Sequence, residues 1–149
     1  MQQDNAETAL SYDLMKDIYA HAEDGFNHWR DNSTAEQKEV GRAEVTRWTT
    51  DRDFAAQQQA FMENAFAEAD INKNGFLLQP EFEKFVKVLM DDGFKRGNYE
   101  DPRPETISNS YMLANRIAPQ AEGVTLQDWN TLCFALVGKT QELKTAAGL

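Results

Sequence analysis

The spacing of apolar side chains along this chain is helical over most of its length. Apolar residues that recur three or four positions apart place one face of a helix against its neighbours. The first such run covers residues 7 to 30. Its apolar members share one predicted helix face: Leu10, Leu14, Met15, Ile18, Tyr19, Ala22, Phe26 and Trp29. This pattern predicts a long amphipathic helix near the start of the chain.

The next region, residues 34 to 69, has a weaker apolar stripe at its beginning. Two capping boxes are available to start a helix there: Ser33 with Glu36, and Thr34 with Gln37. A further cap signal follows at residues 49–51, just before the large apolar residue Phe54. The sequence leaves open whether this region forms one bent helix or two.

Two pairs of apolar stripes follow, and each pair flanks a short polar segment. The first pair is made of Phe61, Met62, Ala65, Phe66 and Ala69, and then of Phe82, Phe85, Val86, Leu89 and Met90. A linker is predicted at residues 91–104, because its glycines and prolines interrupt a helix. Helices are then expected over 105–117 and 124–137. With few glycines and prolines elsewhere, the chain is predicted to be all-α.

The segment between the first two stripes, residues 70–81, carries oxygen-bearing side chains at alternate positions. Positions one, three, five, six and twelve of this segment are Asp70, Asn72, Asn74, Gly75 and Glu81. A hard divalent cation needs several oxygens at short range, so alternate residues must turn inward while the backbone bends around the ion. Glycine at position six permits that bend because it tolerates positive φ. The segment is therefore a candidate calcium-binding loop.

The stretch thus has a predicted helix, a twelve-residue loop and a second predicted helix in succession. In this it resembles the EF-hand superfamily, with Ala65-Phe66 before the loop and Glu81-Phe82 closing it. The resemblance implies calcium ligation by the side chains of Asp70, Asn72, Asn74 and Glu81 and by the carbonyl oxygen of Phe76. Leu78, at position nine, offers no side-chain oxygen, and only two residues bring negative charge. We therefore expect a moderate Ca²⁺ affinity, on the order of 10⁻⁶ to 10⁻⁴ M, and Mg²⁺ as a competitor at the same site.

The second helix pair repeats the first in outline. The segment from Gly123 to Trp129 aligns with residues 75–82, with Asp128 in place of the closing glutamate and one residue fewer. The loop, at about 117–128, lacks carboxylates at its first and third positions, so we expect it to bind no calcium. The resemblance therefore implies an EF-hand pair with one intact and one degenerate hand, joined by a short two-stranded ladder that includes Leu77.

This interpretation divides the chain into three parts. Residues 1–50 form an N-terminal helical region, residues 51–138 form the EF-hand pair, and residues 139–149 form a C-terminal tail. Two hypotheses remain for the first helix. It is either an ordinary core helix, or it occupies the apolar groove that EF-hand pairs present to target helices.

Composition narrows the classes of partner. The formal net charge of −10 opposes binding to nucleic acid or to an anionic membrane, and favours cations or basic protein segments. The single cysteine, Cys133, excludes an internal disulfide framework and is expected to be a small buried hydrophobe. The polar start, residues 1–5, has no apolar stretch suited to a signal peptide or membrane span. A cytoplasmic protein is predicted.

The sequence offers little for an enzyme. It has no nucleophile elbow, phosphate-binding glycine loop or metalloprotease helix motif, and His21 and His28 lack evident catalytic or metal-binding partners. We therefore expect no catalytic activity.

Two functions acting through protein contact remain. In the first, a calcium-responsive sensor or adaptor opens an apolar groove to a protein partner, such as a basic amphipathic helix. The predicted groove residues are Phe61, Met62, Phe85, Val86, Leu89, Met90 and Met112. In the second, the chain is a structural subunit of a larger assembly, and the EF-hand pair is mainly a scaffold.

Overall fold

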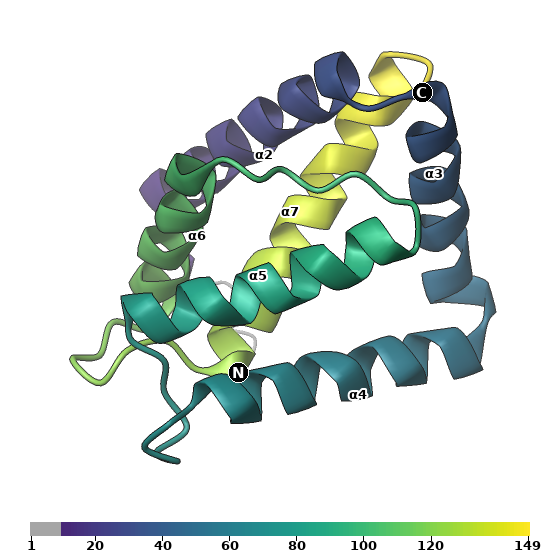
Figure 1. Cartoon of the computed structure of the whole chain (residues 1–149). Coiled ribbons are helices and arrows are strands. Elements are labelled where there is room, and N and C mark those ends of the chain that lie inside the picture. The colour runs from purple at the N-terminus through teal and green to yellow at the C-terminus, as the bar shows by residue number, and fades with distance from the viewer. Residues whose placement is uncertain (1–9) are drawn as a thin grey trace, which may run out of the picture.

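A computed structural model describes residues 10–149 of the chain (Figure 1). Helices account for its regular structure, and no strand occurs in this part of the chain, which confirms the all-α prediction. The helices are α2 (Tyr12–Asn32), α3 (Ala35–Thr50), α4 (Arg52–Ala69), α5 (Gln79–Lys95), α6 (Pro104–Ile117) and α7 (Leu126–Ala146). Residues 7–9 of the first predicted helix lie outside the described residues.

Helix α2 begins after a side-chain cap at Ser11. The side chain of Ser11 accepts a hydrogen bond from the Leu14 amide at 3.1 Å, which satisfies one of the free N–H groups of the first turn. The helix then buries Leu14, Ile18, Ala22 and Phe26, all members of the predicted stripe. This face packs against α6 and α7, so α2 is part of the core of the molecule (Figure 1).

The region from 34 to 69 forms two helices. Of the two possible capping boxes, α3 uses the one formed by Thr34 and Gln37. Asp51 then has extended backbone, with φ −121° and ψ 97°, and its carboxylate accepts the Phe54 amide at 3.1 Å. Asp51 therefore ends α3 and caps α4, which resolves the question that the sequence left open. From there α4 runs along α5 (Figure 1).

Helix α5 extends further than the sequence predicted. It continues through residues 91–95, so the predicted start of the linker at residue 91 was wrong. Gly93 lies inside the helix and is buried, and a Cβ there would overlap the side chain of Glu100. The glycine thus serves close packing of the returning chain rather than a helix break. At the other end of the chain, α7 includes most of the predicted tail, residues 139–149, because it continues to Ala146.

The core takes its buried side chains from α2, α4, α5, α6 and α7 and from the two loops. Phe82 at its centre makes edge-on or tilted ring contacts with Phe85, Tyr111 and Trp129, at centroid distances of 5.3 to 6.3 Å. The largest fully buried side chains come from several elements: Phe82, Phe85, Ile18, Leu77, Leu113, Leu132 and Val124. Leu77 lies in the loop between α4 and α5, and Val124 lies in the loop between α6 and α7. The two loops therefore contribute to the same core as the helices.

The loops meet in one antiparallel bridge. Leu77 and Val124 exchange two backbone hydrogen bonds, each 2.8 Å long, and both side chains are fully buried. The predicted two-stranded ladder was wrong, because no strand flanks this bridge in the described residues. The reason is local, since the residue after each bridge partner already caps a helix: Leu78 caps α5 and Thr125 caps α7. One residue from each loop is therefore all that pairs with the other loop.

Among the described residues, no helix combines the length and the apolar character that a membrane crossing requires.

Candidate functional site

The loop from 70 to 81 starts at the C-terminal end of α4, where Asp70 is 6% exposed. Its carboxylate accepts hydrogen bonds from two backbone amides of the loop, from Asn74 at 3.2 Å and from Gly75 at 2.8 Å. A short acidic side chain that accepts from the backbone ahead of it bends the chain into a turn. The loop therefore folds around the carboxylate of its first residue.

The bend itself depends on two residues with left-handed backbone. Gly75 has a φ of 84°, as the sequence pattern predicts for the sixth position. Lys73 has a φ of 55°, which is uncommon for a residue with a side chain. Its backbone amide donates to the Asp70 carbonyl at 3.1 Å, and its ammonium donates to the Ala67 carbonyl at 2.6 Å. These two bonds hold Lys73 in a conformation that it would otherwise avoid.

The other predicted ligands follow Asp70 along the loop, and in this described part of the chain no hydrogen bond joins the side chain of Asp70 to that of Asn72 or Glu81. The Asn74 side-chain oxygen accepts the Phe76 amide at 3.1 Å, while Asn72 is exposed to solvent. Glu81 is in the first turn of α5, and its carboxylate points back to accept the Leu78 amide at 3.0 Å. The two acidic residues therefore belong to opposite ends of one loop, Asp70 at its start and Glu81 at its end.

The donor chemistry of this loop is limited to oxygen. Such donors suit hard cations such as Ca²⁺ and Mg²⁺ better than softer metals. The described part of the chain contains no group of three or more His, Cys, Asp or Glu residues placed to hold a metal ion. A cation in this loop therefore depends on amide and carbonyl oxygens in addition to two carboxylates.

The second loop, about 117–128, is built differently at its start. Its first position, Ile117, is the last residue of α6, and no carboxylate stands where Asp70 stands in the first loop. Its closing residue, Asp128, is 5% exposed and accepts the Thr125 amide at 3.1 Å. The Thr125 hydroxyl accepts the Asp128 amide in return, also at 3.1 Å. Asp128 is thereby held as a helix cap.

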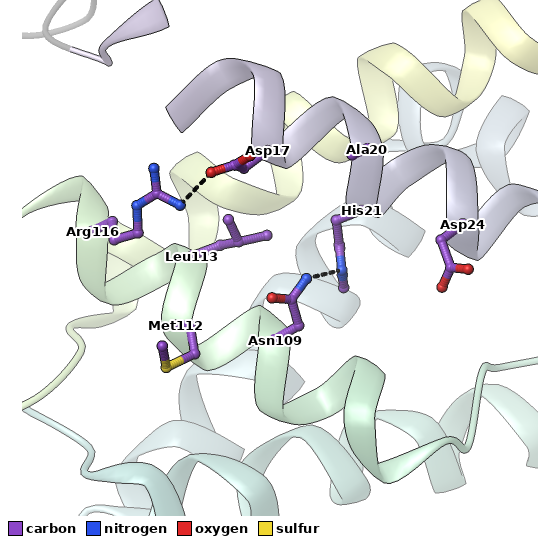
Figure 2. Close-up of a pocket in the computed structure, with 8 residues that line it drawn as sticks. All are labelled: Asp17, Ala20, His21, Asp24, Asn109, Met112, Leu113 and Arg116. Atoms are coloured by element: carbon purple, nitrogen blue, oxygen red, sulfur yellow. Dashed lines mark hydrogen bonds and ion pairs between the residues drawn. The ribbon is translucent and has the colours of Figure 1, made fainter. Parts of the chain in front are cut away.

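The residues predicted to line a partner groove fall into two places. Phe85 and Val86 belong to the buried core, and the half-buried Met62, Leu89 and Met90 pack against that core, while Phe61 on α4 is also half-buried. Met112 is on α6, is 57% exposed and lines a hollow of about 370 Å³ between α2 and α6 (Figure 2). The structure therefore separates Met112 from the other six. The groove remains a prediction for a calcium-bound conformation.

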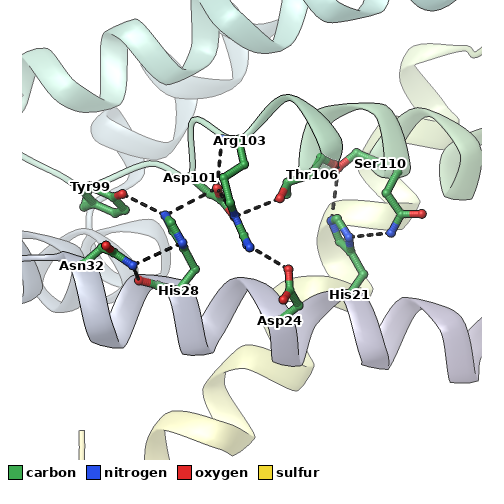
Figure 3. Close-up of polar contacts among 10 residues, drawn as sticks. His21, Asp24, His28, Asn32, Tyr99, Asp101, Arg103, Thr106 and Ser110 are labelled. Atoms are coloured by element: carbon green, nitrogen blue, oxygen red, sulfur yellow. Dashed lines mark hydrogen bonds and ion pairs between the residues drawn. The ribbon is translucent and has the colours of Figure 1, made fainter.

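Sequence reasoning missed a polar seam along α2 (Figure 3). His21 lies 2.9 Å from the amide nitrogen of Asn109 and 3.2 Å from the hydroxyl of Ser110. His28 lies 2.9 Å from the hydroxyl of Tyr99. Both histidines thus contribute to the packing of α2 against α6 and the segment before it. No periodic signal identifies such contacts, because their partners are about 70 to 90 residues away along the chain.

An ion pair strengthens the same seam. Arg103 contacts Asp101 through two hydrogen bonds of 2.9 and 2.6 Å, and its guanidinium also reaches Asp24 on α2 at 2.8 Å (Figure 3). The segment after α5 is therefore tied to the first helix by charge as well as by hydrogen bonds.

A second cluster that the sequence does not reveal joins α3 to the end of α5. Arg96 contacts the buried Glu44 through two hydrogen bonds of 2.6 and 3.1 Å and also pairs with Asp92. Glu100 lies against this cluster, over Gly93. Burial raises the pKa of Glu100 to about 7, and the neighbouring Glu44 and Asp92 raise it as well, while Arg96 opposes the shift. One guanidinium thus faces three carboxyl groups.

Cys133 is unsuited to nucleophilic chemistry. Burial raises the pKa of its thiol to about 12, so the thiolate is scarce at neutral pH. The side chain is half-buried on α7, so the expectation of a buried hydrophobe is met only in part.

The fold and the site define an all-helical protein with an oxygen-lined loop between α4 and α5. Comparisons of the chain with protein-family models, curated proteins and solved structures gave no match. The geometry of the loop and of the surfaces around it is therefore what indicates a function.

Proposed function

We propose that the chain binds Ca²⁺ in the loop of residues 70–81 and acts through protein contact as a calcium-responsive sensor or adaptor. The proposed ligands are the side chains of Asp70, Asn72, Asn74 and Glu81 and the carbonyl oxygen of Phe76, with water completing the shell. Mg²⁺ competes for the same oxygens.

The observation that supports this proposal most is the arrangement at Asp70. Its carboxylate is already buried inside the turn, and the amides of Asn74 and Gly75 hold it there. An ion binding at this point therefore meets a shaped loop, which reduces the entropy lost on binding. The bend at Gly75 is the one that alternate inward-facing ligands require.

In the sensor form of the proposal, Glu81 leaves the Leu78 amide or shares it, and turns towards the loop interior. The start of α5 moves with it, and so do Phe85 and Val86, which α5 contributes to the core. Displacement of these side chains exposes apolar surface between α4 and α5. The formal charge of −10 favours a basic amphipathic helix as the partner.

A scaffold function is the second candidate, and one observation favours it. Helix α2 already covers the apolar face of α6 and α7 with four buried side chains, Leu14, Ile18, Ala22 and Phe26. A protein whose apolar face is covered in this way has less surface to offer to a target helix. In that form, Ca²⁺ holds the loop rigid and the chain serves as a structural subunit.

Calorimetric titration with Ca²⁺ tests the site. We expect heat that saturates with one ion per chain, with a dissociation constant on the order of 10⁻⁶ to 10⁻⁴ M. Glu81→Gln should weaken binding by at least about tenfold, because it removes one of two carboxylates. Glu83→Gln is the matched control, since Glu83 lies on the same helix but outside the loop. Absence of calcium-dependent heat at millimolar ion would contradict the ligand assignment.

A neutral apolar dye separates the sensor from the scaffold. A calcium-dependent rise in dye fluorescence supports the sensor, because apolar surface must open. Unchanged fluorescence, together with proven calcium binding and a stable calcium-free fold, supports the scaffold.

A further inference from the structure

A second hollow, of about 290 Å³, lies away from the loop between α2, α3, α7 and the segment that connects α5 to α6. Its apolar wall includes Phe26 and Trp29 from α2, Val45 from α3 and Leu136 from α7. Its polar lining includes Thr140 and Lys144 from α7. A wall that combines apolar and aromatic side chains with polar groups is typical of sites for small molecules, and this volume is just below their usual range of about 300 to 1,000 Å³.

Lys144 is the charged group of this hollow that lacks an opposite charge. It forms no ion pair with any residue of the described part of the chain. Its ammonium lies 4.3 Å from the ring centroid of Trp29. Burial lowers the pKa of Lys144, and the nearby Arg42 lowers it further. A cation that is partly removed from water beside another cation is stabilised when an anion arrives.

The other charged groups of the lining are already occupied. Asp101 contacts Arg103 through two hydrogen bonds and also accepts the hydroxyl of Thr106. His21 is engaged by Asn109 and Ser110, and burial lowers its pKa, which favours the neutral ring. Lys144 is therefore the group of the hollow available to recognise a ligand charge.

We propose that this hollow binds a small monocarboxylate with an apolar tail. The carboxylate pairs with the ammonium of Lys144 and accepts the hydroxyl of Thr140, while the tail lies among Phe26, Val45 and Leu136. A charge-assisted hydrogen bond sets the orientation, and burial of the tail adds affinity. The site uses residues distinct from those of the calcium loop.

Octanoate is a suitable probe, because it is small and transparent where tryptophan fluoresces. Titration of the full chain with octanoate should produce saturable heat and a change in tryptophan emission, with a dissociation constant on the order of 10⁻⁴ to 10⁻³ M. Lys144→Met keeps the length and apolar stem of the side chain but removes its charge. It should weaken octanoate binding by roughly tenfold to a hundredfold.

Three comparisons make the result decisive. Lys139→Met is the matched control, since Lys139 is on the same helix outside this lining, and it should leave octanoate binding unchanged. Octanol has the same tail without the charge and should bind at least about tenfold more weakly. Val45→Trp fills the hollow and should abolish binding, with the fold checked by circular dichroism. Absence of a saturable response to millimolar octanoate would overturn the proposal, as would equal binding by Lys144→Met or by octanol.

Discussion

The two loops of this protein, residues 70–81 and about 117–128, end in similar ways but begin differently. Each contributes one bridge residue, Leu77 or Val124, and each closes with an acid that caps the following helix, Glu81 or Asp128. The first loop alone has a buried carboxylate at its start. Pairing of the loops therefore requires none of the oxygens proposed to hold a cation, whereas initiation of α5 uses one of them, on the Glu81 carboxylate.

The caps themselves are unequal. In the second loop, Thr125 and Asp128 exchange two hydrogen bonds, so both partners are held. In the first, Leu78 takes the place of the threonine, and its side chain can accept no hydrogen bond in return. One bond from the Leu78 amide holds Glu81. The closing acid that is proposed as a ligand is thus the one that is easier to move.

The glycines of the two loops offer the largest test of this comparison. Gly123 has a φ of 122°, and a Cβ there would overlap the carbonyl oxygen of Leu77. Gly75 has a φ of 84° but open space around it. Gly123→Ala should therefore cost about 3–5 kcal/mol of unfolding free energy, from backbone strain plus overpacking, and Gly75→Ala about 1–2 kcal/mol. Urea unfolding followed by circular dichroism measures both, and equal losses would contradict the proposed difference.

The bridge residues give the next effect. Leu77→Ala should destabilise the fold by about 2–5 kcal/mol, because it empties a fully buried position between the helix pairs. A double-mutant cycle with Val124→Ala should show a coupling of about 0.5–3 kcal/mol, since the two buried side chains belong to residues directly opposite each other in the antiparallel bridge. Additive losses would indicate that the loops are stabilised independently. Ile71→Ala, at a position 67% exposed in the same loop, is the control and should change stability little.

Much of the fold follows from local signals. The apolar period of α2, the Thr34 box and the Asp51 cap each mark an element that the structure contains. The alternating oxygens of residues 70–81 likewise predicted a turn that does bury Asp70. Whether that turn binds Ca²⁺ is still a prediction.

What the sequence did not predict depends on distant partners. By local rules Gly93 predicted the end of a helix, yet α5 continues through it. The glycine is needed there because the side chain of Glu100 packs directly over it. The pair of Glu44 and Arg96 joins residues 52 positions apart, which no local pattern encodes. The loops form a single bridge instead of a ladder, because a helix cap follows each bridge residue directly. This depends on the register in which the two loops pair, which the sequence does not reveal.

Glu100 contrasts with the closing acids of both loops, because it lies buried among carboxylates instead of capping a helix. Its pKa in the folded chain is raised to about 7 from an ordinary value of 4.5, so the folded state holds its proton more tightly than the unfolded state. Its contribution to stability is therefore fully present below about pH 4.5 and is lost as pH rises through 7.

Glu100→Gln should remove this pH dependence. We expect the variant to be more stable than the natural chain at pH 8 by about 2 kcal/mol, with the difference shrinking towards pH 5. The charged groups that face this position are Asp92 on α5, Arg96 at the C-terminal cap of α5, and Glu44 on α3. Urea unfolding of both proteins across this pH range is the measurement, with Glu105→Gln, at an exposed position, as the control. Parallel stability curves for Glu100→Gln and the natural chain would contradict the assignment.

The smallest effect tests the unequal caps directly. Leu78→Thr places in the first loop the hydroxyl that Thr125 provides in the second, so it should complete the cap of α5. Because Leu78 is 46% exposed, the substitution loses little apolar burial, and we expect a gain of about 0.5–1 kcal/mol in the absence of calcium. Leu78→Val, which has a similar branched shape without the hydroxyl, should show no gain. Equal stability of the two variants would show that the missing hydroxyl does not weaken the cap of α5, and would contradict the proposed difference between Glu81 and Asp128.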